Sequence, residues 1–504
     1  MAESSLFKTP CYLFLFLIIG CSVNASSETK SNGIQKPIFP KKAVIPSKEE
    51  WYPTYHLSPP FGWMNDPNGL IWFDGYYHAF YQHNPDAAAF GLMCWGHARS
   101  KDMITWEHLP VALRPSIEAD SNGCFSGSAV DNNGTLTLIY TGNGFDRQTQ
   151  CLASSQDTIN FTNNSKVLDA PGNNPDFRDP KVWREDNKWY MVVGIRVDDG
   201  GQVLLYQSDD LHDWQSQGVL AKGDDSMGFM WECPDFFLLE NKHILLMSPQ
   251  GIQAQGYNNR NLFQSGYYLG TWQPGGQFNI EQDFIEIDNG HDFYATQTFL
   301  ATDGRRIMIA WASMWESPIP EQEQEWAGML SLPRELTLQE NGRIRVRPVG
   351  EIENYRLFQT QINNRVLERE YVELENTTKA MEIITVWDLK QSDAERYGLR
   401  LGDANLAEAG VYLYVDTQAQ RLVLDRRYPQ YGISGYRSVA LPSENLLTLR
   451  VFFDSSSLEV FVNDGEASLT SRIYPLENQR HLALFAENGR ATLQYSSRWW
   501  LGRE

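Results

Sequence analysis

Three acidic residues in the first half of the chain each lie close to a proline and just ahead of a β-rich run. They are Asp66 in WMNDPNG, Asp179 in FRDPK and Glu232 in WECPD. If such carboxyl groups share one pocket their charges repel, so one holds a proton near neutral pH while another stays ionised. A proton donor beside an ionised carboxylate is the pair that cleaves glycosidic bonds. A single Asp-Pro pair is equally typical of a turn, but three at matching positions favour a site.

A strand–turn–strand unit recurs five times ahead of residue 348. The units are Ile71–Tyr81, Ala129–Thr141, Val182–Gly194, Phe236–Ser248 and Phe299–Ala312, with starts 53 to 63 residues apart. A second mark, Ser-x-Asp followed by an aromatic residue, trails the first three units at Ser100, Ser155 and Ser208. About four strands per period of roughly 50 residues predict a five-bladed β-propeller. Coincidental hairpins in a sandwich are the alternative.

The propeller would bring the three carboxyl groups together. The first strand of each blade lines the central axis, so residues at one position of different blades face a shared funnel. Asp66, Asp179 and Glu232 precede the strands of units one, three and four. Phe125-Ser126 and Tyr294 hold the comparable position in units two and five. We therefore expect one cavity with three carboxyl groups, ringed by aromatic side chains.

A second domain follows the repeat, which stops after about Pro348. Residues 349–370 are expected to form a connector, and alternating strands fill 371–504, with a tight-turn signal at Asn463-Asp464-Gly465. This pattern predicts a β-sandwich. The expected fold class is all-β: a five-bladed β-propeller over 51–348 followed by a C-terminal β-sandwich.

The first 25 residues are typical of a signal peptide. The apolar run Tyr12–Ile19 is too short to span a bilayer, and small residues follow it. A lipidated Cys21 is the alternative. Residues 26–50 are polar and read as an N-terminal lead-in. Four Asn-x-Ser/Thr triplets, at Asn133, Asn160, Asn163 and Asn376, fit a secreted, extracellular glycoprotein.

The composition of the chain disfavours some classes of binding partner. The chain has 504 residues, of which 42% are apolar and 21% charged, as in globular proteins. Its net charge of −21 disfavours nucleic acids and anionic membranes, but it does not oppose a neutral sugar. Beyond the signal region, no stretch is apolar and long enough to cross a membrane. The oligomeric state is left open.

Cysteine and histidine spacing gives no metal pattern. Cys94, Cys124, Cys151 and Cys233 match no zinc motif and could form bridges or remain buried thiols. The nine histidines show no ligand spacing either. We therefore expect neither a metal nor a cofactor.

Several motifs then identify a family. WMNDPNG at 63–69, YQHNP at 81–85, WGH at 95–97, FSGS at 125–128, RDP at 178–180 and WECPD at 231–235 stand in order along the chain. Together they strongly resemble the β-fructofuranosidases, the invertase and fructanase family of glycoside hydrolases. The resemblance runs from about His56 to Pro348 and resumes at Asp454–Glu466. That family's fold, a five-bladed propeller with a C-terminal β-sandwich, agrees with the repeat count.

The resemblance implies a role for each carboxyl group. Asp66 would be the nucleophile, Glu232 the acid and then the base, and Asp179 the transition-state stabiliser. Such a double displacement retains configuration, with the Asp66 and Glu232 carboxyl groups about 5–5.5 Å apart. The permanent charge of Arg178 is expected to keep Asp179 ionised. The resemblance also implies these substrate-binding residues: Trp63, Met64, Asn65, Gln82, Trp95, Phe125, Ser126, Arg178 and Trp311.

The substrate beyond the fructosyl unit stays open. Resemblance favours sucrose, with fructan (inulin or levan) hydrolysis or fructosyl transfer as alternatives. An inverting propeller glycosidase of the arabinanase type and a non-catalytic sugar-binding propeller are further alternatives. Loops at 198–201 and 314–325 are candidates for the rim that decides chain length. The sandwich could serve stability, dimerisation or polymer binding.

Overall fold

The computed structural model describes residues 48–503, apart from 173, 198–199, 376, 404–409, 428–430 and 432–433. The predicted signal peptide and most of the predicted lead-in lie outside these residues. The end of the lead-in forms part of a short helix, α1 (Lys48–Trp51). Trp51 is fully buried, and its indole N–H donates to the carbonyl of Pro475, 3.2 Å away.

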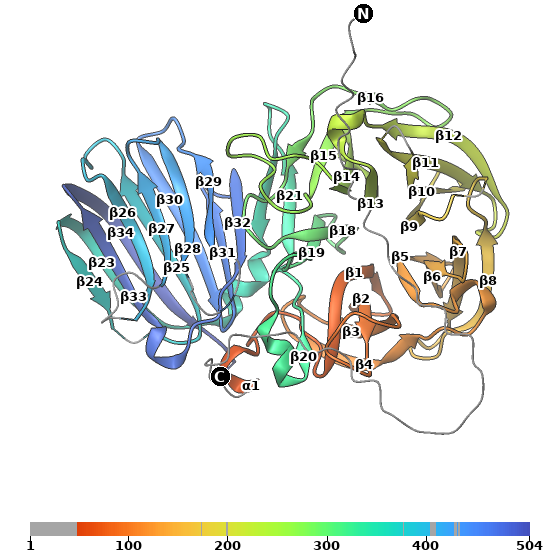
Figure 1. The fold of residues 1–504 in the computed structure, drawn as a ribbon, viewed down its shortest axis with the longest axis horizontal. Coiled ribbons are helices and arrows are strands. Elements are labelled where there is room, and N and C mark those ends of the chain that lie inside the picture. Colours follow the sequence, from red (N-terminus) through yellow and green to blue (C-terminus); the bar gives the residue numbers. More distant parts are fainter. Residues whose placement is uncertain are drawn as a thin grey trace, which may run out of the picture. The chain divides into compact units, whose positions relative to one another are not determined.

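The N-terminal part is a propeller of five antiparallel sheets around a common centre (Figure 1). Blade 1 comprises β1 (Gly62–Phe73), β2 (Tyr76–Asn84), β3 (Cys94–Ser100) and β4 (Trp106–Leu113). Blade 2 comprises β5 (Cys124–Asn132), β6 (Thr135–Asn143), β7 (Gln148–Ser155) and β8 (Thr162–Leu168). Blade 3 comprises β9 (Phe177–Glu185), β10 (Lys188–Val197), β11 (Gly200–Ser208) and β12 (Trp214–Lys222).

Two further blades complete the ring. Blade 4 comprises β13 (Met230–Leu239), β14 (Lys242–Gln250), β15 (Gly266–Thr271), β16 (Asn279–Ile280) and β17 (Ile285–Glu286). Blade 5 comprises β18 (Tyr294–Leu300), β19 (Arg306–Trp311), β21 (Arg334–Leu338) and β22 (Ile344–Pro348). Strand β20 (Trp326–Ala327) leaves blade 5 and pairs in parallel with β1, which closes the ring. The predicted five-bladed propeller is confirmed, and each predicted repeat unit is the first hairpin of one blade.

The second repeat mark is a turn between the third and fourth strands of a blade. In blade 1 one carboxylate oxygen of Asp102 accepts from the Ser100 hydroxyl and from the backbone N–H groups of Ile104 and Thr105, at 2.7–3.0 Å. Asp157 and Asp210 make the same turn in blades 2 and 3. The mark is therefore structural, since an Asp side chain replaces backbone acceptors at a tight turn.

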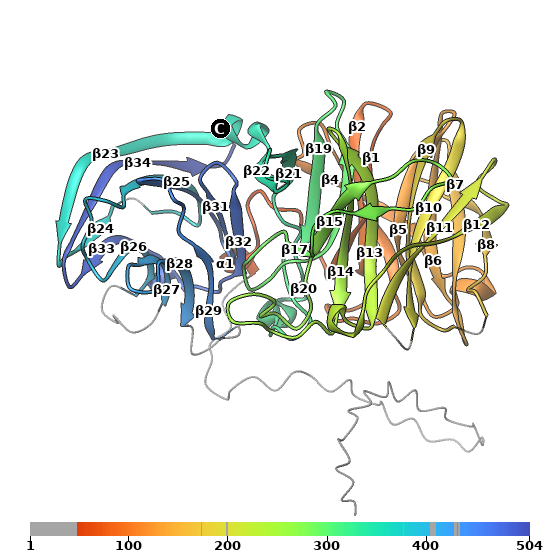
Figure 2. The same cartoon turned by 90° about the horizontal axis from the view of Figure 1, so that it is seen from above.

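The C-terminal part is a sandwich of two six-stranded sheets (Figure 2), as predicted. One sheet comprises β23 (Arg356–Glu368), β34 (Arg490–Leu501), β25 (Ala380–Asp388), β30 (Leu446–Asp454), β31 (Ser457–Val462) and β32 (Ala467–Arg472). The other comprises β24 (Tyr371–Leu374), β33 (His481–Glu487), β26 (Arg396–Gly402), β27 (Gly410–Asp416), β28 (Arg421–Arg427) and β29 (Gly435–Ala440). Apolar side chains from both sheets form one core between them.

The connector is shorter than the predicted 349–370. Only the 3₁₀ turn η4 (Gly350–Tyr355) links the two parts, because β23 already belongs to the sandwich. Strand β23 lies at a sheet edge, and most of its side chains are exposed or half-buried. Its polar residues resemble a linker in sequence because an edge strand has little apolar surface to bury.

A buried charged network joins the propeller to the sandwich. The imidazole of His56 bridges Asp454 and Glu459, each 2.8 Å away. Arg334 of blade 5 binds Glu459 at 2.6 Å and Asp288 at 2.9 Å, and all of these side chains are inaccessible to solvent. The sandwich motif that begins at Asp454 therefore serves the contact between the two parts.

The four described cysteines, Cys94, Cys124, Cys151 and Cys233, are free and buried, which selects the buried-thiol alternative. Two of the predicted glycosylation sites, Asn133 and Asn160, are exposed. Asn376 lies outside the described residues, and so does the side chain of Asn163. In the described part of the chain, no helix has the length and apolar character needed to cross a bilayer.

Candidate active site

The inner strands of the blades share an irregularity at the same end. In β1, Asn65 and Asp66 together lie opposite one residue, Gln82, which is a β-bulge. The same two-against-one arrangement recurs at Asp179-Pro180, Cys233-Pro234 and Ala295-Thr296, and β5 carries an extra residue at Ser126. A bulge turns side chains out of the regular ladder, so five bulges at one level aim five short segments at the centre of the ring.

Prolines lie in or directly after these bulges: Pro180 and Pro234 are each part of one, and Pro67 directly follows the Asn65-Asp66 bulge. A proline lacks a backbone N–H, so it fits at a bulge, where no ladder hydrogen bond is lost. Asp179 and Cys233 also adopt left-handed backbone angles, with φ of 69° and 48°. Such angles are uncommon for residues other than glycine and concentrate at functional sites. The Asp-Pro pattern is thus a device for orienting carboxyl groups.

Asp66 is held by two donors. The Ser126 hydroxyl donates to Oδ2 at 2.7 Å, and the Asn65 amide donates to Oδ1 at 2.9 Å. The Asn65 carbonyl oxygen in turn accepts from the indole N–H of Trp63 at 2.6 Å. This chain fixes the direction in which Asp66 presents its carboxylate.

Glu232 binds three side chains. Arg178 lies 2.8 Å from Oε1, and Oε2 accepts from the Gln250 amide at 2.7 Å and from the Tyr294 hydroxyl at 2.5 Å. Burial raises the pKa of Tyr294, and the charge of Glu232 adds to that rise, so this phenol stays a donor. The three partners come from blades 3, 4 and 5 and fix Glu232 in the centre.

Cys233 links the two aspartates. Its backbone N–H donates to Asp179 Oδ2 at 2.9 Å, and its sulfur lies 3.7 Å from both Asp179 Oδ2 and Asp66 Oδ2. The two carboxylate oxygens therefore lie within twice that distance of each other. Because Glu232 directly precedes Cys233, the three acids form one cluster.

Burial and mutual repulsion shift the acidity of this cluster. The pKa of Asp66 is raised to about 6, chiefly by burial and also by the charge of Glu232, while the Ser126 hydrogen bond opposes the rise. The pKa of Asp179 is raised to about 7, chiefly by burial and then by Glu232. Perturbed carboxyl groups in a shared cleft are typical of catalytic sites.

Arg178 opposes the rise in the pKa of Asp179 without cancelling it, so the sequence-based expectation that it keeps Asp179 ionised is met only in part. Its charge lowers the pKa of Asp179, but burial and Glu232 outweigh it. The reason is geometric: the guanidinium is bound by Glu232 and by Asp176, at 2.8 and 2.9 Å. A cation shared between two other carboxylates is a weaker counter-ion for a third.

Two predicted binding residues support the site from behind. Gln82 donates to the carbonyl of Cys124 at 2.9 Å, and Trp95 donates to the carbonyl of Phe125 at 3.0 Å. Both side chains are buried, and both hold the strand that carries Ser126. Met64 lies elsewhere: its side chain is fully buried in the main hydrophobic core and belongs to a different apolar cluster from Trp63.

Aromatic rings form a wall beside the carboxyl groups. The ring centroids of Trp63 and Trp311 lie 6.1 Å apart, and the ring of Trp315 packs on both of them. Phe90 contacts Trp315 and the half-buried Phe125, and it is 47% exposed. The indole N–H of Trp311 is buried without a hydrogen-bond partner among the described residues. The wall thus runs from the buried floor to the surface, and Trp315 comes from the predicted rim segment 314–325.

Sequence reasoning missed four features of this site: Phe90, Cys233, Gln250 and the hydrogen bond of Tyr294 to Glu232. It included Trp315 only as part of the rim segment 314–325. Tyr294 had the correct position in the repeat, and that signal could have found it. Gln250 and Phe90 come from the second strand and a loop, where the repeat gives no positional signal. The other predicted rim segment, 198–201, is described only at Gly200 and Gly201.

Comparisons with known proteins agree with this geometry. The N-terminal domain model of glycosyl hydrolases family 32 matches residues 56–348, and the C-terminal model of the same family matches 351–500. A sucrose-6-phosphate hydrolase of Escherichia coli is 52% identical over 463 residues, covering 90% of this chain and 95% of the relative. A raffinose invertase of Escherichia coli is 51% identical over 461 residues, with the same coverage.

Solved structures show the same fold. A β-fructofuranosidase of Bombyx mori, solved also as a mutant in complex with sucrose, is 37% identical with a TM-score of 0.79; the match covers 90% of this chain and 94% of that one. A sucrose-6-phosphate hydrolase of Lactobacillus gasseri is 28% identical with a TM-score of 0.81, covering 90% and 93%. This chain belongs to glycosyl hydrolase family 32 and is a glycosidase of the β-fructofuranosidase type.

Proposed function

We propose that the protein hydrolyses sucrose to glucose and fructose, releasing the terminal β-D-fructofuranosyl unit with retention of configuration. Asp66 attacks the anomeric carbon of the fructosyl unit and forms a covalent fructosyl-enzyme. Glu232 protonates the leaving glycosidic oxygen and then deprotonates the water that releases fructose. Asp179 accepts hydrogen bonds from fructose hydroxyls while the ring carries oxocarbenium character.

One observation carries the proposal: Cys233 contacts both Asp66 and Asp179 and directly follows Glu232 in the chain. Three carboxyl groups from blades 1, 3 and 4 in one buried cluster give the charge asymmetry that double displacement needs. Fixed donors on Asp66 and Glu232 hold both groups before substrate arrives, which lowers the reorganisation needed at the transition state.

The electrostatics of the cluster favour sucrose over its 6-phosphate. Arg178 is the only cation among the described residues that bind the three carboxyl groups, and Glu232 and Asp176 already occupy it. A phosphate on the leaving glucosyl unit would bring about two negative charges near neutral pH close to this acidic cluster. The aromatic wall formed by Trp63, Trp311 and Trp315 offers apolar faces that suit a neutral sugar ring.

Other fructosides share the unit that would be cleaved. Raffinose, inulin and levan differ from sucrose beyond the fructosyl group, and a sugar acceptor could replace water in the second step. The rim residues Phe90 and Trp315 would decide among these, since they are the exposed part of the wall.

The test follows products by NMR. We expect sucrose to give glucose and β-D-fructofuranose as the first fructose anomer, ahead of mutarotation. The first appearance of the opposite anomer would establish inversion, as in arabinanase-type enzymes, and overturn the mechanism. Preferred turnover of sucrose 6-phosphate, inulin or levan, or fructosyl-oligosaccharides as main products, would overturn the substrate assignment. The absence of any turnover would leave a sugar-binding propeller.

We also propose that the protein is secreted and glycosylated. Support comes from the apolar run Tyr12–Ile19 and from the exposed positions of Asn133 and Asn160. Expression in a eukaryotic secretory host should yield a glycosidase-sensitive mass shift that is reduced in Asn133→Gln/Asn160→Gln. Retention of the protein in the cell without such a shift would refute the proposal.

A further inference from the structure

A cavity of about 760 Å³ opens beside blade 1, at the end of the strands away from the carboxyl cluster. Its lining comes from blade 1, from η4 and the start of β23, and from the residues that follow β34. We call it the blade 1 cavity, and these residues line it: Tyr76, Arg99, Ser100, Lys101, Asp102, Thr105, Trp106, Glu107, Asn354, Tyr355, Arg356, Leu357, Gly502 and Arg503.

Strand register separates this cavity from the proposed active site. Asp66 lies in the first half of β1, whereas Tyr76 pairs with Phe73 at the other end of that strand. Ser100 and Trp106 pair with each other at this same far end. Phe73 lies seven positions after Asp66 along β1, which corresponds to a distance on the order of 20 Å. A ligand in the blade 1 cavity would therefore be distinct from the substrate.

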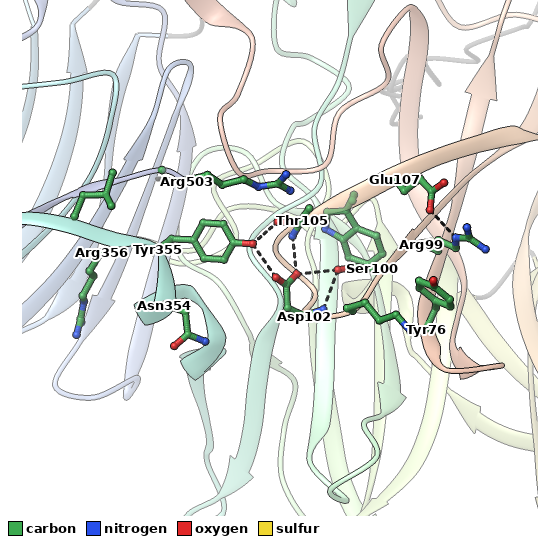
Figure 3. Close-up of a pocket in the computed structure, with 14 residues that line it drawn as sticks. Tyr76, Arg99, Ser100, Asp102, Thr105, Glu107, Asn354, Tyr355, Arg356 and Arg503 are labelled. Atoms are coloured by element: carbon green, nitrogen blue, oxygen red, sulfur yellow. Dashed lines mark hydrogen bonds and ion pairs between the residues drawn. The ribbon is translucent and has the colours of Figure 1, made fainter.

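The polar centre of the cavity is built from one network (Figure 3). The Tyr355 hydroxyl donates to Asp102 Oδ2 at 2.7 Å and also meets the Thr105 hydroxyl. The other oxygen of Asp102 accepts from Ser100 and from two backbone N–H groups. Both carboxylate oxygens of Asp102 are therefore occupied, and Tyr355 is fixed as part of the wall.

The cavity has an excess of positive charge. Four cations but only two carboxylates, Asp102 and Glu107, line it. Glu107 pairs with Arg99 at 2.7 Å, and Arg356 pairs with Glu382 outside the lining at 2.7 Å. Lys101 and Arg503 are exposed and form no ion pair with any described residue. In a chain of net charge −21, two unpaired cations beside one cavity attract an anion.

Geometry partly orients one of these cations. The Lys101 ammonium donates to the carbonyl of Gly75 at 2.8 Å and lies 3.6 Å from the centre of the Tyr76 ring. Its remaining N–H groups are free for a ligand, because an ammonium has three donors. Arg503 offers a planar fork of donors, which matches the oxygens of a phosphate.

The cavity also has aromatic side chains in its wall. Trp106 and Tyr355 are both half-buried, so each ring shows part of its surface to the cavity. Flat rings pack on the C–H faces of sugars. The exposed amide of Asn354 adds a donor and an acceptor for hydroxyl groups.

We propose that the blade 1 cavity is a second binding site that takes a phosphorylated sugar. Lys101 and Arg503 bind the phosphate, and the rings of Trp106 and Tyr355 contact the sugar. Because its wall joins blade 1 to the connector and the C-terminal strand, an occupied cavity also stabilises the folded chain.

Calorimetric titration of the full chain with glucose 6-phosphate tests this proposal. Inorganic phosphate and glucose are the two partial probes. We expect glucose 6-phosphate to bind at least about tenfold more tightly than either partial probe, and more weakly as salt rises. The variant Lys101→Ala/Arg503→Ala should weaken it by about tenfold or more, with kcat/KM for sucrose unchanged.

Matched controls separate this site from general charge effects and from the proposed active site. Lys390→Ala/Arg490→Ala likewise removes one lysine and one arginine, but from exposed positions on the sandwich that do not line the cavity. This variant should bind glucose 6-phosphate as the parent does. Arg503→Gln alone provides a milder variant, because it removes the charge of a single exposed side chain. Saturating fructose should leave the binding unchanged if it occurs in the blade 1 cavity.

Three results would overturn the proposal: no binding at millimolar glucose 6-phosphate, binding that survives the double substitution, or equal affinity for inorganic phosphate. None of these depends on which fructoside the enzyme cleaves, so the proposed function and this second site fail independently.

Discussion

The guanidinium of Arg178 lies 2.8 Å from the carboxylate of Glu232 and forms an ion pair that crosses from blade 3 to blade 4. The carboxylate of its sequence neighbour Asp179, on the same strand, accepts instead from the Cys233 backbone N–H, while the Asp179 backbone N–H donates to the Thr141 hydroxyl. Arg178 therefore fixes the position of the residue that we propose as the acid and base.

Arg178→Gln should lower kcat for sucrose about 100-fold, because a displaced general acid loses its alignment with the leaving oxygen. Arg178→Lys keeps the charge but not the forked geometry, so its kcat should lie between those of the parent protein and Arg178→Gln. Steady-state kinetics on sucrose measure the effect. Arg184→Gln, which removes an exposed charge from the same blade, is the control. Unchanged kcat in Arg178→Gln would remove this role.

The pH–rate profile should show an acidic limb governed by Asp66. The nucleophile must be ionised, and its pKa is raised to about 6, so kcat/KM should fall as pH drops through about 6. Ser126→Ala removes a hydrogen bond that lowers this pKa and should move the limb to higher pH. A limb that does not move in Ser126→Ala would contradict the assignment of that limb to Asp66.

Asp179→Asn should stabilise the fold at pH 8 by about 1–3 kcal/mol while abolishing activity. The folded pKa is about 7 against an ordinary value of 3.8, so the folded state binds the proton more tightly. Stability is therefore lost as pH rises from about 4 to 7, and asparagine escapes that loss. Urea unfolding at pH 4 and pH 8 measures it. An equal difference at both pH values would argue against this origin.

The network around His56 should set the pH range of stability. Burial lowers the pKa of His56, but its bonds to Asp454 and Glu459 raise it to about 9. Because this folded pKa exceeds the ordinary 6.5, the stabilisation is complete below 6.5 and is lost as pH rises through 9. The pKa of Glu459 is lowered to about 2, since the charges of Arg334 and His56 outweigh its burial. Its stabilisation is therefore present above 4.5 and lost as pH falls through 2.

His56→Ala should cost about 3–5 kcal/mol at pH 6, because it leaves buried carboxylates without a partner. His481→Ala provides a matched control: it breaks a His–Glu pair on the surface, where a salt bridge contributes less than about 1 kcal/mol. Thermal unfolding at pH 6 and pH 10 measures both variants. A similar loss in the two would show that burial of the network adds nothing.

The fold could be predicted from the sequence because the repeat is periodic. Each unit, such as Val182–Gly194, contains two strands and a turn within a short stretch of sequence. The spacing of the units is therefore enough to predict the number of blades and the blade to which each of the three acids belongs. The bulge that turns Asp179 inward leaves no periodic signal of its own, and the adjacent Pro180 is its only trace. Pattern thus located the carboxyl groups but not the backbone geometry that aims them.

Contacts between distant segments were beyond sequence reasoning. Arg178 is adjacent to Asp179 in the chain, yet its partner Glu232 lies 54 residues further on. His56 and Glu459 are separated by 403 residues, so no local pattern relates them. Strand β23 was mistaken for a connector because an edge strand with polar side chains lacks the alternation that marks buried strands.

The central claim is that Asp66 and its two partner acids act together on one fructosyl unit. Initial rates of sucrose hydrolysis by Asp66→Ala test it most directly, beside Asp283→Ala, which removes an exposed carboxylate from blade 4. We expect Asp66→Ala to lose at least about 10⁴-fold in kcat, with its fold intact by circular dichroism, and Asp283→Ala to retain full activity. Comparable activity in the two variants would contradict the claim.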